Sequence, residues 1–238
     1  MKITIIHEQN RRGSACALAR RLAQKAGGPV KEFFLPKDFN HFCTGCRQCF
    51  EEETRCPHRK DLEPLLEALD EADLIILASP VYVFHASGPM KSFLDHLGWR
   101  WMVHRPEGSM FRKQAVCLCT AAGAGLRGAC RDMADSLTFW GVPRVYRFGL
   151  ALRAADYDNM SDQRRRAVQK HLDRLAGRIR RRAGRVSIAL KTWLLFHIAR
   201  LLQKKGLNPP DAAYWQAGGW LGTDRPWKAG AEGKIPAA

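Results

Sequence analysis

The sequence predicts an α/β protein with a doubly wound, five-stranded parallel sheet, helices on both faces and a helical C-terminal extension. Three observations predict it. Apolar strands alternate with amphipathic helices over about the first 150 residues, as in parallel-sheet domains. Two strands are apolar almost throughout, which is typical of central strands buried on both faces. After residue 160 the pattern changes to helices only.

The first half of the predicted domain holds three strands and two helices. "KITIIH" at 2–7 is a strand, and Ser14 is suited to cap the helix that follows. "VKEFFL" at 30–35 is the second strand. "DLEPLLEALDEA" at 61–72 has leucines at helical spacing, and "DLIILASP" at 73–80 is the third strand, which we expect to be central.

The second half continues the alternation. A helix begins at about Gly88, and "QAVCLCT" at 114–120 is a second central strand. A helix over roughly 128–140 and the strand "RVYRFGLAL" at 144–152 complete the domain. In a doubly wound sheet the ligand binds at the carboxyl edge, and we expect it where the loops after strands one and three meet.

We divide the chain into two parts. Residues 1–160 form the sheet domain, with a cysteine-rich insertion at 41–58, and residues 161–238 form a basic helical extension with a Trp- and Gly-rich tail. The net charge is +16, and residues 161–207 carry fourteen Lys and Arg against two Asp. The excess positive charge is therefore local to the extension and does not characterise the whole chain.

The basic extension carries two narrow apolar stripes at helical spacing. We expect these helices to dock on the sheet domain or across a dimer, because a charge run is usually a solvated face. Contact with an anionic membrane is the alternative. Nucleic acid is the least favoured partner, because the segment has no recognised module or stacking platform. The stripes are Val168, Leu172, Leu175 and Ile179, then Leu190, Leu194, Ile198 and Leu202.

Three loops at the expected ligand edge suit a flat, anionic ligand. "HEQNRRGSA" leads from a strand into a helix, whose amino end presents N–H groups and a positive dipole to an anion. "SPVYVFHASGP" can bring backbone amides and an aromatic ring against a heterocycle. "CTAAGAGLRG" is made of small residues, as required where backbone approaches a ligand closely.

Two segments of the sequence resemble a known family, one of these loops and the cysteine-rich insertion. "SPVYVFHASGPMKSFLDH" resembles the S-P-V-Y-x(5)-G-x(2)-K-x-F-x-D segment of flavodoxin-like NAD(P)H-dependent FMN reductases. "FCTGCRQC" resembles the C-x-G-C-x-x-C insertion of the branch that includes the iron–sulfur flavoproteins. The resemblance covers nearly the whole chain. It implies a flavodoxin-like fold, bound FMN, NAD(P)H as the electron donor and a homodimer.

The resemblance places the FMN phosphate on the first loop and the isoalloxazine ring on the loop after strand three. The first loop departs from the family's usual G-S-P-R-x-x-G-x-T, with Glu8 at the usual Ser and Ala15 at the usual Thr. We expect weaker phosphate contacts there unless Arg11, Arg12 and Ser14 compensate. The residues implied for cofactor binding are Gln9, Asn10, Arg11, Gly13, Ser14, Ala15, Pro80, Val81, Tyr82, Val83, Thr120, Ala121, Ala122 and Gly123.

The same resemblance implies an FMN-dependent NAD(P)H oxidoreductase that passes electrons to a small oxidant such as a quinone or a nitroaromatic. No side chain needs to act as acid or base, because the flavin carries the reaction. An alternative is an iron–sulfur flavoprotein that moves electrons between a ferredoxin-like partner and an acceptor. A non-enzymatic alternative is a membrane- or nucleic-acid-associated binding protein with a vestigial flavin fold.

Four cysteines lie within fourteen residues and leave three interpretations open. The spacing suits a [4Fe–4S] cluster, which takes four thiolates from compact loops. The thiols could instead shape a loop near the flavin without metal, or hold structural zinc with His41 and His58 nearby. The metal-ligand candidates are Cys43, Cys46, Cys49 and Cys56.

A disulfide frame is the least favoured use of these cysteines. The N-terminal apolar run is too short for a signal-peptide core, and no apolar run is long enough for a membrane span. We therefore expect a reducing, cytoplasmic setting, where thiols stay free.

Overall fold

The computed structural model describes residues 1–9 and 13–228 and contains the predicted sheet. Its five strands are all parallel and lie in the order β2-β1-β3-β4-β5. The predicted fold class is confirmed. The strands are β1 (Ile3–His7), β2 (Val30–Phe34), β3 (Leu74–Pro80), β4 (Gln114–Ala121) and β5 (Arg144–Ala151).

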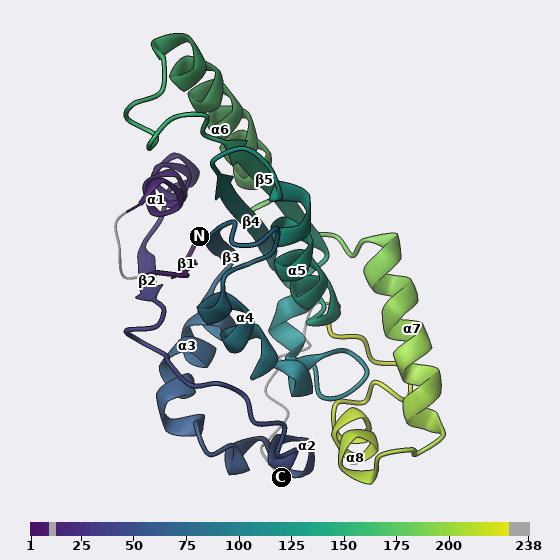
Figure 1. Cartoon of the computed structure of the whole chain (residues 1–238). Coiled ribbons are helices and arrows are strands. Elements are labelled where there is room, and N and C mark those ends of the chain that lie inside the picture. The colour runs from purple at the N-terminus through teal and green to yellow at the C-terminus, as the bar shows by residue number, and fades with distance from the viewer. Residues whose placement is uncertain (10–12, 229–238) are drawn as a thin grey trace.

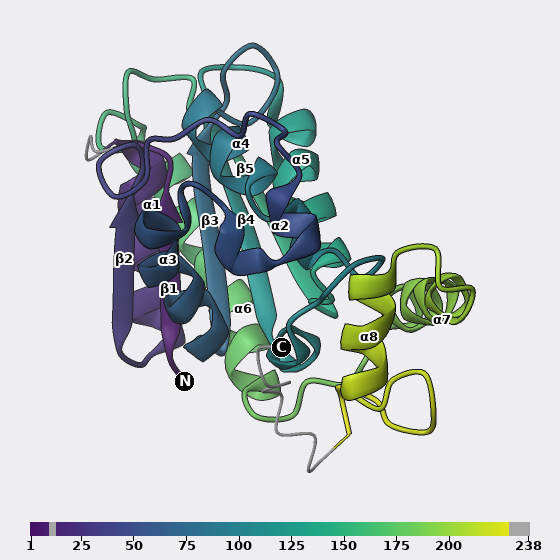
Figure 2. The same ribbon diagram turned by 90° about the horizontal axis from the view of Figure 1, so that it is seen from below.

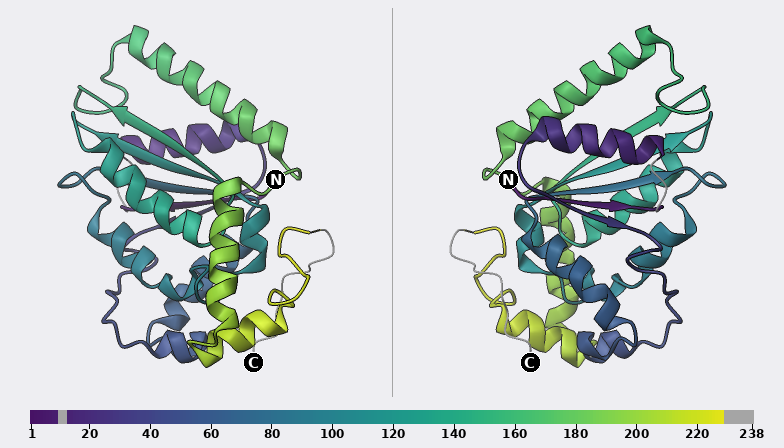
Figure 3. Two further views of the ribbon diagram at one scale, coloured as in Figure 1. Left: turned by 90° about the vertical axis from the view of Figure 1, so that its right-hand side faces the viewer. Right: turned by 90° about the vertical axis from the view of Figure 1, so that its left-hand side faces the viewer.

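Helices cover both faces of the sheet (Figures 1 and 3). On one face lie α1 (Ser14–Ala26) and α6 (Asp162–Arg182). On the other lie α3 (Arg59–Glu71), α4 (Gly88–Asp95) and α5 (Leu126–Phe139). The remaining helical elements are α2 (Gln48–Glu51), η1 (Glu53–Arg55), η2 (Gly98–Arg100), η3 (Gly108–Arg112), α7 (Leu190–Lys204) and α8 (Pro209–Ala217).

The side chains of the central strands separate into two cores. Successive residues of a strand point to opposite faces, so Ile5 packs with α1 and α6 while Ile6 packs with the helices of the other face. Every residue of β4 is buried, and β3 is buried up to Pro80. The edge strand β2 is partly exposed. The near-continuous apolar runs of the sequence therefore mark the middle of the sheet, as predicted.

The start of α1 differs from the prediction. Gly13 occupies the N-cap position with extended backbone, and Ser14 is already the first helical residue. The prediction of Ser14 as N-cap is therefore wrong. Its Oγ instead accepts a hydrogen bond from the backbone N–H of Tyr157 at 2.9 Å, which ties α1 to the segment after β5.

The two apolar stripes of the C-terminal extension behave differently. In α6 the stripe from Val168 to Ile179 is buried against α1 and the sheet, so docking is confirmed for this helix. In α7 the predicted stripe is wrong as a docking face, since Leu190, Leu194 and Ile198 are exposed. Helix α6 begins after residue 160 and shares a core with α1 of the sheet domain. The division of the chain at residue 160 stays a prediction.

The opposite face of α7 forms a third, smaller core together with α8, to one side of the sheet (Figure 2). Phe196 of α7 and Trp215 of α8 are fully buried and pack with Trp220 and Phe111. The indole N–H of Trp215 donates to the backbone carbonyl of His104 at 2.6 Å. The tail thus covers the segment before β4 and leaves one side of α7 without a partner in the described structure.

None of the helices in residues 1–9 and 13–228 is both long enough and apolar enough to cross a membrane.

Candidate functional site

A cavity of about 480 Å³ opens at the carboxyl edge of the sheet, between the segments that follow β1, β3, β4 and β5. Its walls bring together ten of the fourteen residues predicted to bind a cofactor. They are Gln9, Gly13, Ser14, Ala15, Pro80, Val81, Tyr82, Thr120, Ala121 and Ala122.

The other four predicted residues do not line this cavity in the described structure. Asn10 and Arg11 lie outside the described residues. Val83 and Gly123 are not among the residues that line the cavity in the described part of the chain. Val83 lies at the tip of a tight turn and is 90% exposed, and its contact with the ligand stays a prediction.

The cavity also contains residues that sequence reasoning missed. His7 and Glu8 close it at the end of β1, and Leu152, Ala154 and Asp156 contribute from the segment after β5. The carboxyl ends of all parallel strands lie at one edge, so the fifth strand's loop could have been added on topology alone. No sequence signal distinguishes His7 from a buried strand residue.

Backbone hydrogen bonds continue the sheet past the strand ends and hold the loops in place. The N–H of Glu8 donates to the carbonyl of Ala78 at 3.0 Å, and that of Val81 donates to Thr120 at 2.7 Å. The N–H of Leu152 donates to Ala121 at 2.8 Å. The cavity walls are therefore extensions of a rigid sheet, which suits a site that must hold a ligand in one orientation.

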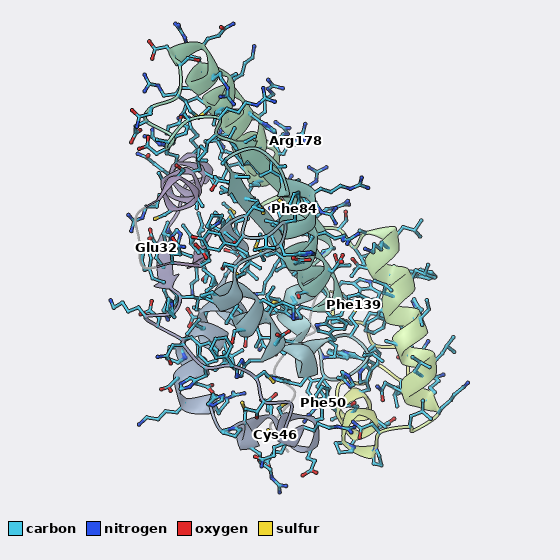
Figure 4. The ribbon with its side chains drawn as sticks, viewed as in Figure 1. Glu32, Cys46, Phe50, Phe84, Phe139 and Arg178 are labelled. Carbon is cyan, nitrogen blue, oxygen red and sulfur yellow. The ribbon has the colours of Figure 1, made fainter. Side chains whose placement is uncertain are left out.

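The rim of the cavity is a strained turn. Tyr82 and His85 exchange backbone hydrogen bonds of 3.1 and 3.0 Å around Val83 and Phe84, whose φ angles are +48° and +67°. Left-handed backbone at a β-branched residue is uncommon and costs about 1–3 kcal/mol, so it persists only where the surroundings impose it. Both side chains at the tip are exposed, and Figure 4 labels Phe84.

Two glycines make room for this turn, Gly125 in the loop after β4 and Gly128 in the first turn of α5. A Cβ on Gly125, which has φ of +84°, would lie 2.7 Å from Val81 Cγ1. A Cβ on Gly128 would lie 2.3 Å from the carbonyl oxygen of Phe84. The small residues expected to approach a ligand thus include two that accommodate the neighbouring loop instead.

One end of the cavity suits an anion. Helix α1 begins there, and its N-cap residue is Gly13, which has no side chain to cap the amino end. Unpaired amides and the helix dipole favour negative charge at such a position. Because Ser14 Oγ accepts the N–H of Tyr157, its hydroxyl hydrogen remains to be donated. Glu8 does not turn away to solvent but is buried in the wall, and Arg11 and Arg12 lie outside the described residues.

His7 supplies a buried hydrogen-bond acceptor in the same wall. Its Nε2 lies 3.2 Å from Oε2 of Glu32, which is held in turn by Arg20 at 2.8 Å. Burial lowers the pKa of His7 despite Glu32, so the ring is neutral at pH 7 with its hydrogen on Nε2. Nδ1 then carries a lone pair, is buried and has no hydrogen-bond partner within residues 1–9 and 13–228.

The opposite rim is aromatic. Tyr82 is 44% exposed at the cavity edge, and its hydroxyl accepts a hydrogen bond from the side-chain amide of Gln9. This contact joins the loops after β1 and β3 across the opening. A helix amino end for phosphate, a buried acceptor for a hydroxyl and an aromatic rim for a flat ring fit the three parts of FMN.

The four clustered cysteines lie in another part of the molecule, and Figure 4 shows Cys46 beside α2, well away from Phe84. Cys43 and Cys46 are exposed, whereas Cys49 and Cys56 are half-buried. Burial, together with the three neighbouring thiols, raises the pKa of Cys49 to about 11.

The compact set of donor atoms in this region is not made of the four sulfurs. The sulfur of Cys56 lies within 4.8 Å of ring nitrogens of His58 and His96, and this is the compact metal-ligand set among the described residues. One sulfur with two nitrogens does not fit a [4Fe–4S] cluster, which takes four thiolates. The four-cysteine cluster therefore stays a prediction of the sequence.

Comparisons with known proteins point to one family. The model of the NADPH-dependent FMN reductase family matches residues 1–155. The chain is 32% identical to an iron–sulfur flavoprotein of Archaeoglobus fulgidus over 74 residues, which are 31% of this chain and 33% of that protein. It is 31% identical to one of Methanocaldococcus jannaschii over 72 residues, 30% of this chain and 36% of that protein. The matches thus span about a third of the length of these curated relatives.

Solved structures share the fold at low sequence identity. An azoreductase from Bacillus anthracis has a TM-score of 0.59 and 13% identity, covering 75% of this chain and 99% of its own. A flavone reductase has a TM-score of 0.56 and 17% identity, covering 78% of this chain and 64% of its own.

Proposed function

Because the chain belongs to the NADPH-dependent FMN reductase family, we propose that its cavity binds FMN and that electrons pass from NAD(P)H through it to a small oxidant. A quinone or a nitroaromatic is the acceptor class. The observation that supports this function best is the cavity itself, in which an uncapped helix end, a buried acceptor and an aromatic rim converge at one sheet edge.

The chemistry supplied by bound FMN is acceptance of a hydride from the nicotinamide and delivery of two electrons to the oxidant. The protein's own residues bind and orient. The first-turn amides of α1 and the hydroxyl of Ser14 would hold the phosphate, and Nδ1 of His7 would accept a ribityl hydroxyl. Arg20 and Glu32 keep the hydrogen of His7 on Nε2, which leaves Nδ1 as the acceptor.

The residues at the wide end of the cavity would set the plane of the ring. Pro80 and Val81 are fixed by the β3–β4 hydrogen bonds, and Tyr82 closes the opening through Gln9. Because the turn at Val83 and Phe84 is held by the glycine-containing loop after β4, this wall has little freedom to move. The nicotinamide would have to reach one face of the ring, and the exposed rim at Tyr82, Val83 and Phe84 would lie on the side from which it enters.

Truncation of the rim aromatic tests the function. Tyr82→Ala should weaken FMN retention by roughly tenfold or more, because stacked aromatic contacts are worth about 1 kcal/mol beyond the apolar area they bury. Tyr82→Phe keeps the ring and loses only the contact with Gln9, so it should retain most of the FMN. The measurements are bound flavin per chain after gel filtration and NADPH consumption with a quinone acceptor.

Equal FMN retention by wild type and Tyr82→Ala would contradict the placement of the ring. NADPH consumption that persists in flavin-free protein would contradict the proposed function itself.

We further infer that α7 contacts an anionic lipid surface. Its exposed face carries Leu190, Trp193, Leu194, Ile198 and Leu201, and there is no Asp or Glu between residues 190 and 207. Exposed Lys191, Lys204 and Lys205 lie on the same helix and its end. An apolar face with flanking lysines suits a helix that lies in the headgroup region of a membrane.

Vesicle flotation tests this partner. Wild type should float with phosphatidylserine-containing vesicles at low salt and less with zwitterionic ones, because each lysine near an anionic surface contributes about 1 kcal/mol. Leu194→Glu with Leu201→Glu should abolish flotation. Ala167→Glu adds one negative charge at an exposed position of α6, is the matched control for Leu194→Glu alone, and should float. If the wild type binds no vesicles and forms a dimer that Leu194→Glu dissociates, this face of α7 contacts a second copy of the chain instead.

A further inference from the structure

We propose that Cys56, His58 and His96 form a binding site for a single borderline-soft divalent ion such as Zn²⁺. The sulfur of Cys56 and one ring nitrogen of each histidine lie within 4.8 Å of one another. Zn²⁺ in proteins takes cysteine sulfur at about 2.3 Å and imidazole nitrogen at about 2.0–2.1 Å, which this spacing accommodates. The site lies outside the cavity assigned to FMN and is independent of it.

The three ligands lie just outside the ends of two helices. Cys56 and His58 immediately precede α3, and His96 follows the last residue of α4. His96 is 3% exposed, and the other two residues are half-buried. The ring of His41 stacks on His58 at a centroid distance of 4.2 Å, and Phe39 meets His96 edge-on at 4.8 Å. An ion here would join the end of the cysteine loop to the helical layer.

One hydrogen bond orients His96 in the way that metal-ligating histidines are oriented. Nδ1 of His96 lies 2.8 Å from the carbonyl oxygen of Ser92, which can only accept, so this nitrogen carries a hydrogen. Ligating histidines usually donate their second nitrogen to a carbonyl or carboxylate in this way. Nε2 of His96 is then the nitrogen that faces His58 Nδ1, at 2.9 Å.

A single hydrogen lies between these two nitrogens. Two N–H groups cannot face one another at 2.9 Å, so one nitrogen holds a lone pair and the other holds the shared hydrogen. When a cation binds, that hydrogen moves to the other nitrogen of a neutral His58 ring, or leaves as a proton if the ring is charged. The Cys56 thiol loses its proton to solvent as its sulfur becomes a ligand. At least one proton is released per ion, and binding therefore weakens as pH falls.

The arrangement gives Cys56 a role different from that of the other clustered cysteines. Cys43 and Cys46 are exposed and lie outside the compact set. A four-thiolate cluster would need all four cysteines equally, whereas the proposed ion needs only one of them and both histidines. Substitution of single cysteines therefore distinguishes the proposed ion site from a four-thiolate cluster.

The test is equilibrium binding of Zn²⁺ and Co²⁺ to the full chain, reduced and freed of metal. The expected stoichiometry is about one ion per chain, with Co²⁺ showing the absorption of a thiolate ligand. Cys56→Ser and His58→Gln should each weaken binding by roughly a hundredfold, since even the loss of an outer partner costs 10–100-fold. Cys43→Ser is the matched control and should bind as wild type.

Circular dichroism shows whether each variant has folded. His58 is substituted instead of His96 because His58 is only half-buried, so its replacement disturbs the fold less. Weaker Zn²⁺ binding at pH 6 than at pH 8 in the wild type would support the proton release. Absent binding by folded wild type would overturn the proposal. Equal loss of Zn²⁺ affinity in Cys43→Ser and Cys56→Ser would also overturn it. So would about four irons per chain after anoxic purification, because the four cysteines would then hold an iron–sulfur cluster.

Discussion

Replacement of Gly128 by Ala is expected to destabilise the protein and release FMN, although Gly→Ala inside a helix usually stabilises by about 1 kcal/mol. Gly128 lies in α5, and an added Cβ would stand 2.3 Å from the backbone oxygen of Phe84. Backbone cannot yield as a flexible side chain can. The clash must push the turn at Val83 and Phe84 outward, and overpacking of this kind costs about 1–3 kcal/mol.

Gly177→Ala in α6 provides the matched control. Its added Cβ would meet only the Arg181 guanidinium at 3.6 Å, an ordinary contact, so this variant should gain stability by about 1 kcal/mol. Urea denaturation and bound flavin per chain measure both effects. If Gly128→Ala were as stable as Gly177→Ala and kept its FMN, the turn would not be the fixed wall that the structure describes.

Substitution of Ala15 should lower or raise FMN affinity, according to whether the new side chain is a negative charge or a hydrogen-bond donor. Ala15 lies in the first turn of α1 and lines the anion end of the cavity. Ala15→Asp adds a charge that favours the helix dipole by about 0.3–1 kcal/mol but repels the phosphate. FMN should therefore bind roughly tenfold or more weakly, a change of about 1.4 kcal/mol or more.

Ala15→Thr tests the same position with a donor. The hydroxyl restores the hydrogen bond that the family's usual Thr provides, and hydrogen bonds to charged groups contribute about 1.5–3 kcal/mol. FMN affinity, measured by quenching of flavin fluorescence, should rise by roughly tenfold. Unchanged affinity in both Ala15→Asp and Ala15→Thr would show that the phosphate lies elsewhere.

The sheet could be predicted because its strands depend on local composition. β3 was expected at 73–80 and spans Leu74–Pro80, since an uninterrupted apolar run between helical segments has few other uses. The loops that form the cavity followed from topology, because parallel strands end at one edge. Ten predicted residues meet there, from segments as far apart as Gln9 and Ala122.

What the sequence could not predict depends on contacts between distant segments. The tight turn at Val83 and Phe84 packs closely over Gly125 and Gly128, which no feature of the local sequence indicates. The leucine stripe of α7 was expected to dock, but Phe196 on the other side is larger and meets the indoles of the tail. The pairing of His58 with His96 joins residues 38 positions apart, and nothing in either neighbourhood marks it.

The most direct test of FMN as the cofactor is an absorption spectrum of protein purified without oxygen, with flavin, iron and zinc quantified on the same sample and NADPH then added. We expect about one FMN per chain, and bleaching of its visible bands by NADPH. Colourless protein that takes up no FMN would contradict it, and would leave a binding protein with a vestigial flavin fold.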